Sequence, residues 1–168
     1  MKIKKNILYL SFDGITDPLG RSQILPLITE LSKNYIVNLL TIEKKLFFNS
    51  TYKNISKTII KNNIKHYKIN FYKNYFLKIL SFIYFFFIIL KIIILNKIEL
   101  IHVRGYQPLI FLYPIKFLKK IKIIFDIRGF WPEEKIDRNN WSKKNFIYKF
   151  FKKIENVFIK YSTIIICL

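Results

Sequence analysis

The sequence predicts an α/β protein built on a doubly wound parallel sheet. Short apolar segments rich in Ile, Val, Leu and Tyr recur along the chain, and longer segments with helical spacing lie between them. Short continuous apolar runs are typical of strands that helices cover on both faces. Strands that alternate with helices imply right-handed crossovers. With 168 residues, the chain is long enough for one real core, so we expect a single domain over 1–168.

Six apolar segments are predicted to be the strands. In chain order they read NILYLSF, YIVNLLTIE, IKHYKIN, ELIHVRG, IKIIFDIRG and STIIICL, at 6–12, 35–43, 64–70, 99–105, 121–129 and 162–168. No internal repeat or low-complexity linker interrupts them.

Three of the intervening segments have clear helical spacing. Residues 22–33 place Ile24, Ile28 and Leu31 on one stripe. Pro26 falls near the start of this helix, where proline is tolerated. The segments at 107–120 and 143–161 are also predicted helices, the second with a basic outer face.

The segment at 76–97 is apolar over a length close to that of a membrane span, which needs about 20 residues. Lys78 and Lys91 interrupt it, so its longest uncharged run is only 79–90. We expect a crossover helix that leads to the strand at Leu100 and rests one apolar side on a membrane. A single-span membrane protein with this helix in the bilayer is the alternative.

The formal net charge of +20 suggests an anionic partner. Lys, Ile, Asn, Phe and Tyr are all abundant and alanine is absent, a pattern that an AT-rich genome produces, so we interpret most lysines as a solvated face. The remaining charge favours an anionic membrane surface. Only four arginines are present, which argues against nucleic acid as a partner, because arginine is the favoured base-reading residue.

Cysteine and histidine are too few for a disulfide or a metal site. Cys167 is the single cysteine, and His66 and His102 are far apart in the sequence. We therefore expect a buried thiol in a reducing compartment, no metal and no cofactor. The start of the chain alternates like a strand and enters a polar loop, so we do not expect a signal peptide.

Glycine and arginine are scarce and gather after the predicted strands. Three of the four arginines stand within one residue of one of the four glycines. Ligands of open α/β sheets bind at the carboxyl ends of the strands. After the first strand, Gly20, Arg21 and Ser22 are predicted at a helix N-terminus, which attracts phosphate. A tight turn that needs glycine is the alternative.

Two further strands end in Arg-Gly, an aromatic residue and Pro. IHVRGYQP and FDIRGFWPEE would together form one rim that suits a hydroxylated ligand with an anionic group, such as a sugar phosphate or sugar lipid. The candidate binding residues are Arg104, Gly105, Tyr106, Gly129, Trp131 and Glu134, and the candidate catalytic residues are Asp126, Arg128 and Glu133. Each has a structural alternative: Asp126 can pair with Arg128 or Arg104, and the Trp131 ring can close the loop over the core. His102 is expected to be a hydrogen-bonded core residue.

The chain resembles the N-terminal domain of bacterial family-four glycosyltransferases, which have the GT-B fold. ILYLSFDGITDPLGRSQILPLITELSKNYIVNLLTIEK resembles the opening of that domain. IHVRGYQPLIFL and IIFDIRGFWPEEKIDRNNW resemble its middle, and YKFFKKIENVFIKYSTIIICL its late helix and strand. DGITDPLGRSQ and DIRGFWPEE are typical of a subgroup associated with surface polysaccharide assembly.

This resemblance implies a Rossmann-like domain that mainly holds the acceptor, with Gly20 and Arg21 near the phosphates of a nucleotide-diphosphate sugar. The implied acceptor is a lipid-linked saccharide, and the implied location is cytoplasmic, peripheral on the inner face of the plasma membrane. Many relatives have histidine where Arg128 aligns. The donor domain of the family would follow Leu168, so we expect this chain to be inactive alone. It would be the product of a truncated gene, a fragment, or one half of a split enzyme whose donor domain is a separate chain. A non-catalytic sugar- or nucleotide-binding module is the alternative.

Overall fold

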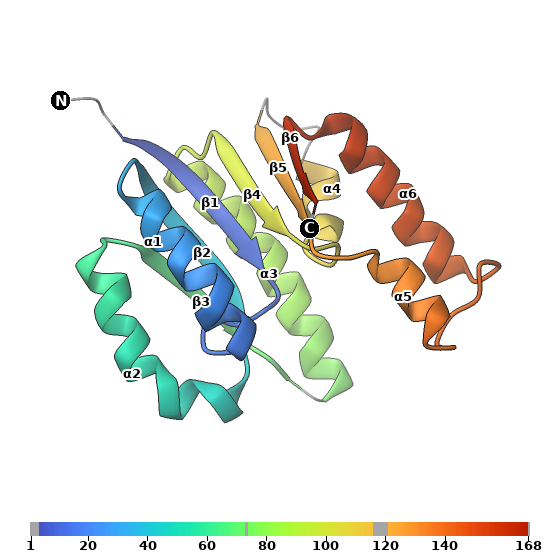
Figure 1. The fold of residues 1–168 in the computed structure, drawn as a ribbon, viewed down its shortest axis with the longest axis horizontal. Helices are drawn as coiled ribbons and strands as arrows, with labels where there is room; N and C mark the ends of the chain where they lie inside the picture. The colour runs from blue at the N-terminus through green and yellow to red at the C-terminus, as the bar shows by residue number, and fades with distance from the viewer. Residues whose placement is uncertain (1–3, 73, 116–120, 168) are drawn as a thin grey trace.

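The computed structural model describes residues 4–72, 74–115 and 121–167 and contains a six-stranded, all-parallel sheet (Figure 1). The order across the sheet is β3-β2-β1-β4-β5-β6. This is the doubly wound order of dinucleotide-binding folds. The strands are β1 (Lys5–Ser11), β2 (Tyr35–Glu43), β3 (Lys65–Asn70), β4 (Leu100–Arg104), β5 (Lys122–Ile127) and β6 (Ile164–Cys167). The predicted fold class is confirmed. Five strands lie within their predicted segments, and β1 begins one residue before its segment, at Lys5.

Six α-helices are seen in the described part of the chain. They are α1 (Leu25–Ser32), α2 (Lys45–Lys61), α3 (Tyr75–Leu95), α4 (Leu109–Ile115), α5 (Trp131–Asp137) and α6 (Phe146–Tyr161). A π-helical turn (Gly20–Ile24) leads into α1, in which Pro26 occupies the first turn as predicted. The end of the helix predicted at 107–120 lies outside the described residues, and α2 and α5 were not predicted.

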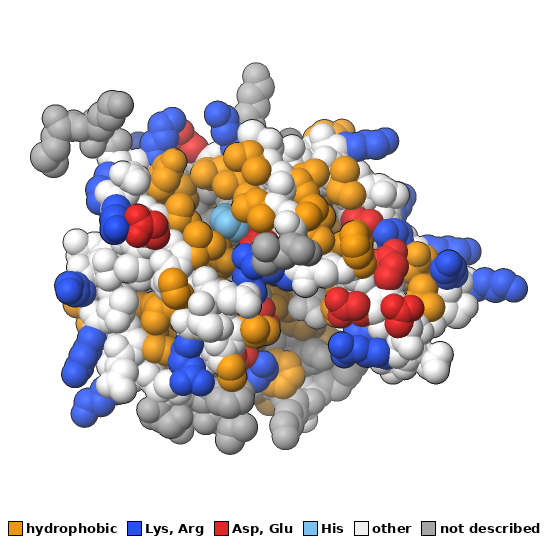
Figure 2. Space-filling view, in the orientation of Figure 1, with side chains coloured by type: hydrophobic (Ala, Val, Ile, Leu, Met, Phe, Trp, Pro, Cys, Tyr) orange, Lys and Arg blue, Asp and Glu red, His pale blue; other side chains and the backbone are white. Residues whose placement is uncertain are grey.

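The helices cover the two faces of the sheet, with α1 and α2 on one face and α3 and α4 on the other (Figure 1). Side chains alternate along β1, so Tyr9 packs with Ile28 and Ile59 on the first face, and Leu10 packs with Phe85 on the second. Figure 2 shows lysines and arginines spread around much of the outline of the face it displays.

The helix α3 is the crossover from β3 to β4, as expected. Phe85, Ile89, Ile92 and Ile93 are buried against the sheet, and Asn74 caps the helix by accepting a hydrogen bond from the Leu77 amide. Within the described residues, no helix combines the length and the apolar character that crossing a membrane requires. The alternative of a single span over 76–97 is wrong, because one face of this helix belongs to the core.

The cysteine near the end of β6 is exposed, contrary to the expectation of a buried thiol. β6 lies at the edge of the sheet, where Ile164 and Ile165 are also partly exposed. An apolar run in sequence becomes buried only where other elements cover it.

Candidate functional site

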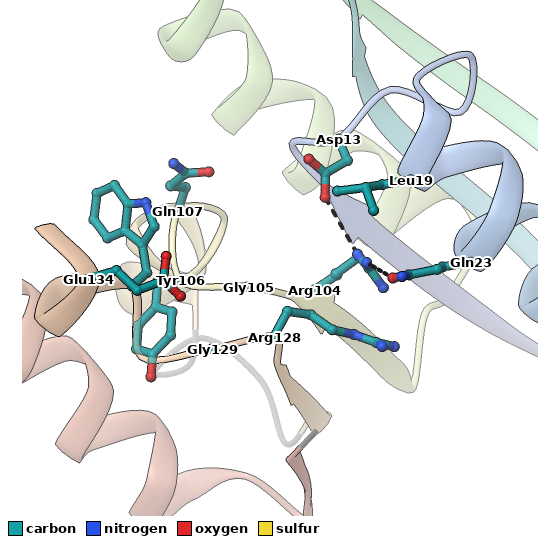
Figure 3. Close-up of a pocket in the computed structure, with 11 residues that line it drawn as sticks. Asp13, Leu19, Gln23, Arg104, Gly105, Tyr106, Gln107, Arg128, Gly129 and Glu134 are labelled. Carbon is teal, nitrogen blue, oxygen red and sulfur yellow. Dashed lines mark hydrogen bonds and ion pairs between the residues drawn. The ribbon is translucent and has the colours of Figure 1, made fainter. Parts of the chain in front are cut away.

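A pocket of about 440 Å³ lies where β1, β4 and β5 end, at the carboxyl edge of the sheet (Figure 3). We call it the polar pocket. Its lining residues are Asp13, Leu19, Gln23, Arg104, Gly105, Tyr106, Gln107, Arg128, Gly129, Trp131 and Glu134. Seven of these residues were predicted from the two Arg-Gly segments, so the structure brings those segments together.

Arg104 is the last residue of β4 and is held from several sides. Its side chain is only 3% exposed. Nη2 donates to Gln23 Oε1, and Nε lies 3.5 Å from Asp13 Oδ2 (Figure 3). Nη1 has no hydrogen-bond partner among the described residues, although it lies 3.9 Å from Asp126 Oδ2. The ion pairs on both sides therefore fix the Arg104 guanidinium at the pocket wall.

Asp126 lies beneath the pocket and holds the second arginine. It is the strand partner of Arg104 and is fully buried. Its Oδ1 is 2.7 Å from Arg128 Nε, and its Oδ2 accepts from Arg128 Nη2 at 2.7 Å. Burial opposes the charged carboxylate, but hydrogen bonds from His102 and Arg128 outweigh it and lower the pKa of Asp126. Asp126 therefore stays ionised and fixes the guanidinium groups.

The glycines of the two Arg-Gly pairs turn the chain out of the sheet. Gly105 has φ +76° and Gly129 has φ +129°, conformations that other residues rarely adopt. The amide of Gly105 donates to the carbonyl of Asp126 at 2.9 Å, which ties the two turns together. The Arg-Gly repeat thus has a clear conformational cause.

The opposite wall of the pocket is aromatic. Trp131 packs edge-on against Trp141 and Phe151, with ring centroids 5.0 Å and 4.7 Å away. Tyr106 is buried and packs edge-on against Phe125. Burial, aided by a nearby carboxylate, raises the pKa of Tyr106, so its phenol is neutral. These contacts fix the rings of Trp131 and Tyr106. Trp131 therefore packs on the core, as its structural alternative states, and both rings also line the polar pocket.

The predicted phosphate site at Gly20, Arg21 and Ser22 lies outside the polar pocket. A Cβ on Gly20 would be 2.0 Å from the carbonyl oxygen of Gly14, so close backbone packing explains this glycine. Arg21 is exposed, and Ser22 Oγ donates to the carbonyl of Pro18 at 2.9 Å. The geometry fits the alternative of a tight turn.

The three candidate catalytic residues have different positions. Arg128 lines the polar pocket, and Asp126 lies beneath it. Glu133 faces α6 instead, where its Oε1 is 2.9 Å from Lys152 Nζ and accepts from the Tyr148 hydroxyl at 3.3 Å. The catalytic role of all three remains a prediction.

Four pocket residues were missed from the sequence: Asp13, Leu19, Gln23 and Gln107. All four lie in the segments that contain the scarce glycines and arginines, within two residues of one of them. Asp13 follows β1, which pairs with β4 so that Ser11 lies beside Arg104. Knowledge of that strand order would have identified Asp13.

A buried carboxylate shapes the loop that carries Asp13. Glu43 is 1% exposed, and it accepts from the Ile15 amide at 2.8 Å, from Thr16 Oγ1 at 2.6 Å and from Thr41 Oγ1 at 2.5 Å. Thr41 Oγ1 is also 2.8 Å from His66 Nε2. Burial raises the pKa of Glu43, but the interaction with His66, whose Nε2 lies 3.6 Å from Oε1, and the hydrogen bonds from Thr16, Thr41 and Ile15 outweigh it and lower the pKa to about 2. The loop is therefore fixed by charge-assisted hydrogen bonds.

Searches of family models and of curated proteins return no match. Among solved structures, the chain is similar to a glycosyltransferase from Rickettsia africae ESF-5, with 17% identity and a TM-score of 0.48. The match covers 79% of this chain and 33% of that one, so the chain spans about a third of the length of that structure. Similarity at this level is too low to assign a function.

Proposed function

We propose that this chain is the acceptor-binding domain of a glycosyltransferase that moves a sugar from a nucleotide-diphosphate sugar to a lipid-linked saccharide in surface polysaccharide synthesis. The resemblance of DGITDPLGRSQ and DIRGFWPEE to family-four enzymes supports this proposal. The second of these segments supplies Arg128, Gly129, Trp131 and Glu134 to the polar pocket.

The balance of charges in the polar pocket is the observation that carries the proposal. Two guanidinium groups line the pocket together with the carboxylates of Asp13 and Glu134, and Asp126 lies beneath them. A nucleotide diphosphate would meet both negative and positive groups there. A saccharide has hydroxyl groups that donate to carboxylates and accept from arginine, and its C–H face packs on an aromatic ring. The pocket therefore suits the acceptor better than the donor phosphates.

In this proposal Arg128 is the candidate that can act on the reaction. Its side chain is 25% exposed and is oriented by the Asp126 carboxylate. A fixed positive group at the pocket wall would stabilise negative charge that develops on the departing donor phosphate. Asp126 is then a positioning residue, because it is buried beneath the guanidinium.

We also propose that the domain docks on the inner face of the plasma membrane. The helix α3 follows a loop from the carboxyl end of β3, and α6 follows α5, which itself leaves the carboxyl end of β5 (Figure 1). The first turns of α3 and α6 therefore lie toward the edge that holds the polar pocket. Those turns expose apolar side chains: Phe76, Leu77, Ile79, Leu80 and Ile83 on α3, and Phe146, Ile147 and Phe150 on α6. Exposed apolar helix faces beside lysines fit an anionic lipid surface.

Calorimetric titration tests the function directly. We expect saccharides and glycolipids from a panel of candidates to bind, and nucleotide sugars to bind far more weakly. Trp131→Ala should weaken saccharide binding about tenfold through loss of the aromatic wall, and Gln107→Ala about threefold through loss of one hydrogen bond. Phe87→Ala, at a ring that is 60% exposed on α3, is the matched control and should change nothing.

The opposite preference would refute the acceptor role. If nucleotide sugars bind and Trp131→Ala weakens them while every saccharide and glycolipid fails to bind, the pocket serves the donor. If the two pocket variants bind saccharide as the wild type does, the pocket is not the saccharide site.

A further inference from the structure

An apolar groove of about 430 Å³ lies next to the polar pocket. We call it the phenylalanine groove. Its apolar lining comprises Phe12, Ile42, Phe71, Phe82, Ile110, Phe111 and Phe151. Asp13 and Gln107 line both the groove and the polar pocket, so the two spaces are adjacent.

The walls of the groove are formed by a packed set of rings. The ring centroids of Phe12, Phe82 and Phe111 are each 5.8 Å from one another. Phe85 lies behind them, 5.1 Å from Phe12 and 5.0 Å from Phe111, and is fully buried. Because the rings support one another, the groove exists without a ligand and needs little reorganisation to bind one.

Polar groups in the groove are few. Lys44 lines it but forms an ion pair with Asp17, at 2.5 Å between Nζ and Oδ2. Asp13 and Gln107 stand at the junction with the polar pocket. An occupant of the groove itself would therefore find mainly aromatic and aliphatic surface, which favours a hydrocarbon chain.

The groove also leads toward exposed apolar surface. Phe71, directly after β3, is 40% exposed. On α3, Phe82 lines the groove, and its neighbours Ile79 and Ile83 are 41% and 50% exposed. A chain that leaves the groove along α3 would thus remain in contact with apolar side chains.

We propose that the phenylalanine groove binds the hydrocarbon chain of an amphiphilic acceptor whose saccharide occupies the polar pocket. The inference rests on the proposed function for the saccharide and adds a separate site for the lipid. One molecule with a polar head and an apolar chain fits two adjacent spaces of these opposite characters, joined at Asp13 and Gln107.

The test uses alkyl glycosides of increasing chain length, titrated by calorimetry below their micelle concentrations. Ethyl, butyl, hexyl and octyl glycosides of glucose, galactose and N-acetylglucosamine are the probes, and octylphosphocholine is the control without a sugar. Full burial of one methylene tightens binding by about fourfold. We expect at least about 30-fold between the ethyl and octyl forms of the sugar that binds.

Two groove variants and one matched control localise the effect. Phe71→Ser and Phe82→Ser should reduce the gain from ethyl to octyl to less than about fivefold and leave the affinity for the ethyl glycoside unchanged. Phe87→Ser, on the same helix as Phe82 but outside the groove, should keep the full gain. Thermal melting measures whether each variant folds. If Phe82→Ser does not fold, Phe71→Ser provides the test, because Phe71 is partly exposed.

The outcomes separate the two proposals. Equal binding of ethyl and octyl glycosides refutes the groove and leaves the saccharide site standing. A full gain in both groove variants also refutes the groove, because the chain then binds elsewhere. Octylphosphocholine binding as tightly as the octyl glycosides, with loss in the groove variants, supports the groove and refutes the saccharide site. No binding of any glycoside or of octylphosphocholine refutes both.

Discussion

Replacement of Glu43 by glutamine tests how the loop beside the polar pocket is held. The carboxylate accepts hydrogen bonds from the Ile15 amide and from the hydroxyls of Thr16 and Thr41. A glutamine of the same size replaces one acceptor oxygen by an NH₂ group. The N–H groups of that side chain would then face groups that themselves donate hydrogen bonds. The pKa of Glu43 is lowered from 4.5 to about 2, and that difference corresponds to about 3 kcal/mol of folding free energy at neutral pH.

The pH dependence has a definite sign. Because the pKa is depressed in the folded state, the stabilisation is complete above pH 4.5 and is lost as the pH falls toward about 2. Glu43→Gln should therefore lower the free energy of unfolding by about 3 kcal/mol at pH 7 and by much less near pH 2. Groups that titrate equally in both proteins cancel in this difference.

Urea unfolding of the wild type and the variant across that pH range measures the effect. Glu30→Gln is the matched control, since Glu30 is exposed and pairs with Lys33 on the surface of α1; its effect should stay within about 0.5 kcal/mol. A loss below about 1 kcal/mol for Glu43→Gln at pH 7, or a loss that is the same at pH 2.5, would refute the reasoning.

Two further predictions concern stability, each measured by chemical unfolding. Gly20→Ala should lower the free energy of unfolding by more than about 2 kcal/mol, because its Cβ would lie 2.0 Å from the Gly14 carbonyl oxygen. Gly105→Ala has open space and should lower it by only about 1–2 kcal/mol, because of the positive φ at this position. The reverse order would contradict the packing role of Gly20. Phe85→Ala should cost about 3–5 kcal/mol because the ring is fully buried, and Phe87→Ala less than about 1; similar losses would show that α3 does not bury the face described.

The elements with strong local patterns were predictable. Short apolar segments identified the six strands, and the central ones are continuous runs because a central parallel strand is buried on both faces. The helix α2 was missed because it is rich in asparagine, threonine and lysine, although Ile55 and Ile59 form its buried stripe. The short helix α5 was missed because it begins in a loop, at Trp131 and Pro132.

The candidate site was predictable in part. The two Arg-Gly segments follow strands that are adjacent in the sheet, so their placement at one rim was correct. The first glycine-rich loop was expected at the same site because it also follows a strand. Gly20 packs on the backbone instead, and no local pattern distinguishes a glycine needed for close packing from one needed for a ligand.

The sequence by itself determined the α/β class, the strands and the turns after β4 and β5, because apolar periodicity and glycine conformation act over a few neighbouring residues. Only the tertiary structure decided that Arg104 lies between Asp13 and the Asp126 carboxylate, which also binds Arg128. Their proximity depends on β1, β4 and β5 lying side by side, and that order is set by the crossovers and by the burial of both sheet faces, which are properties of the whole chain.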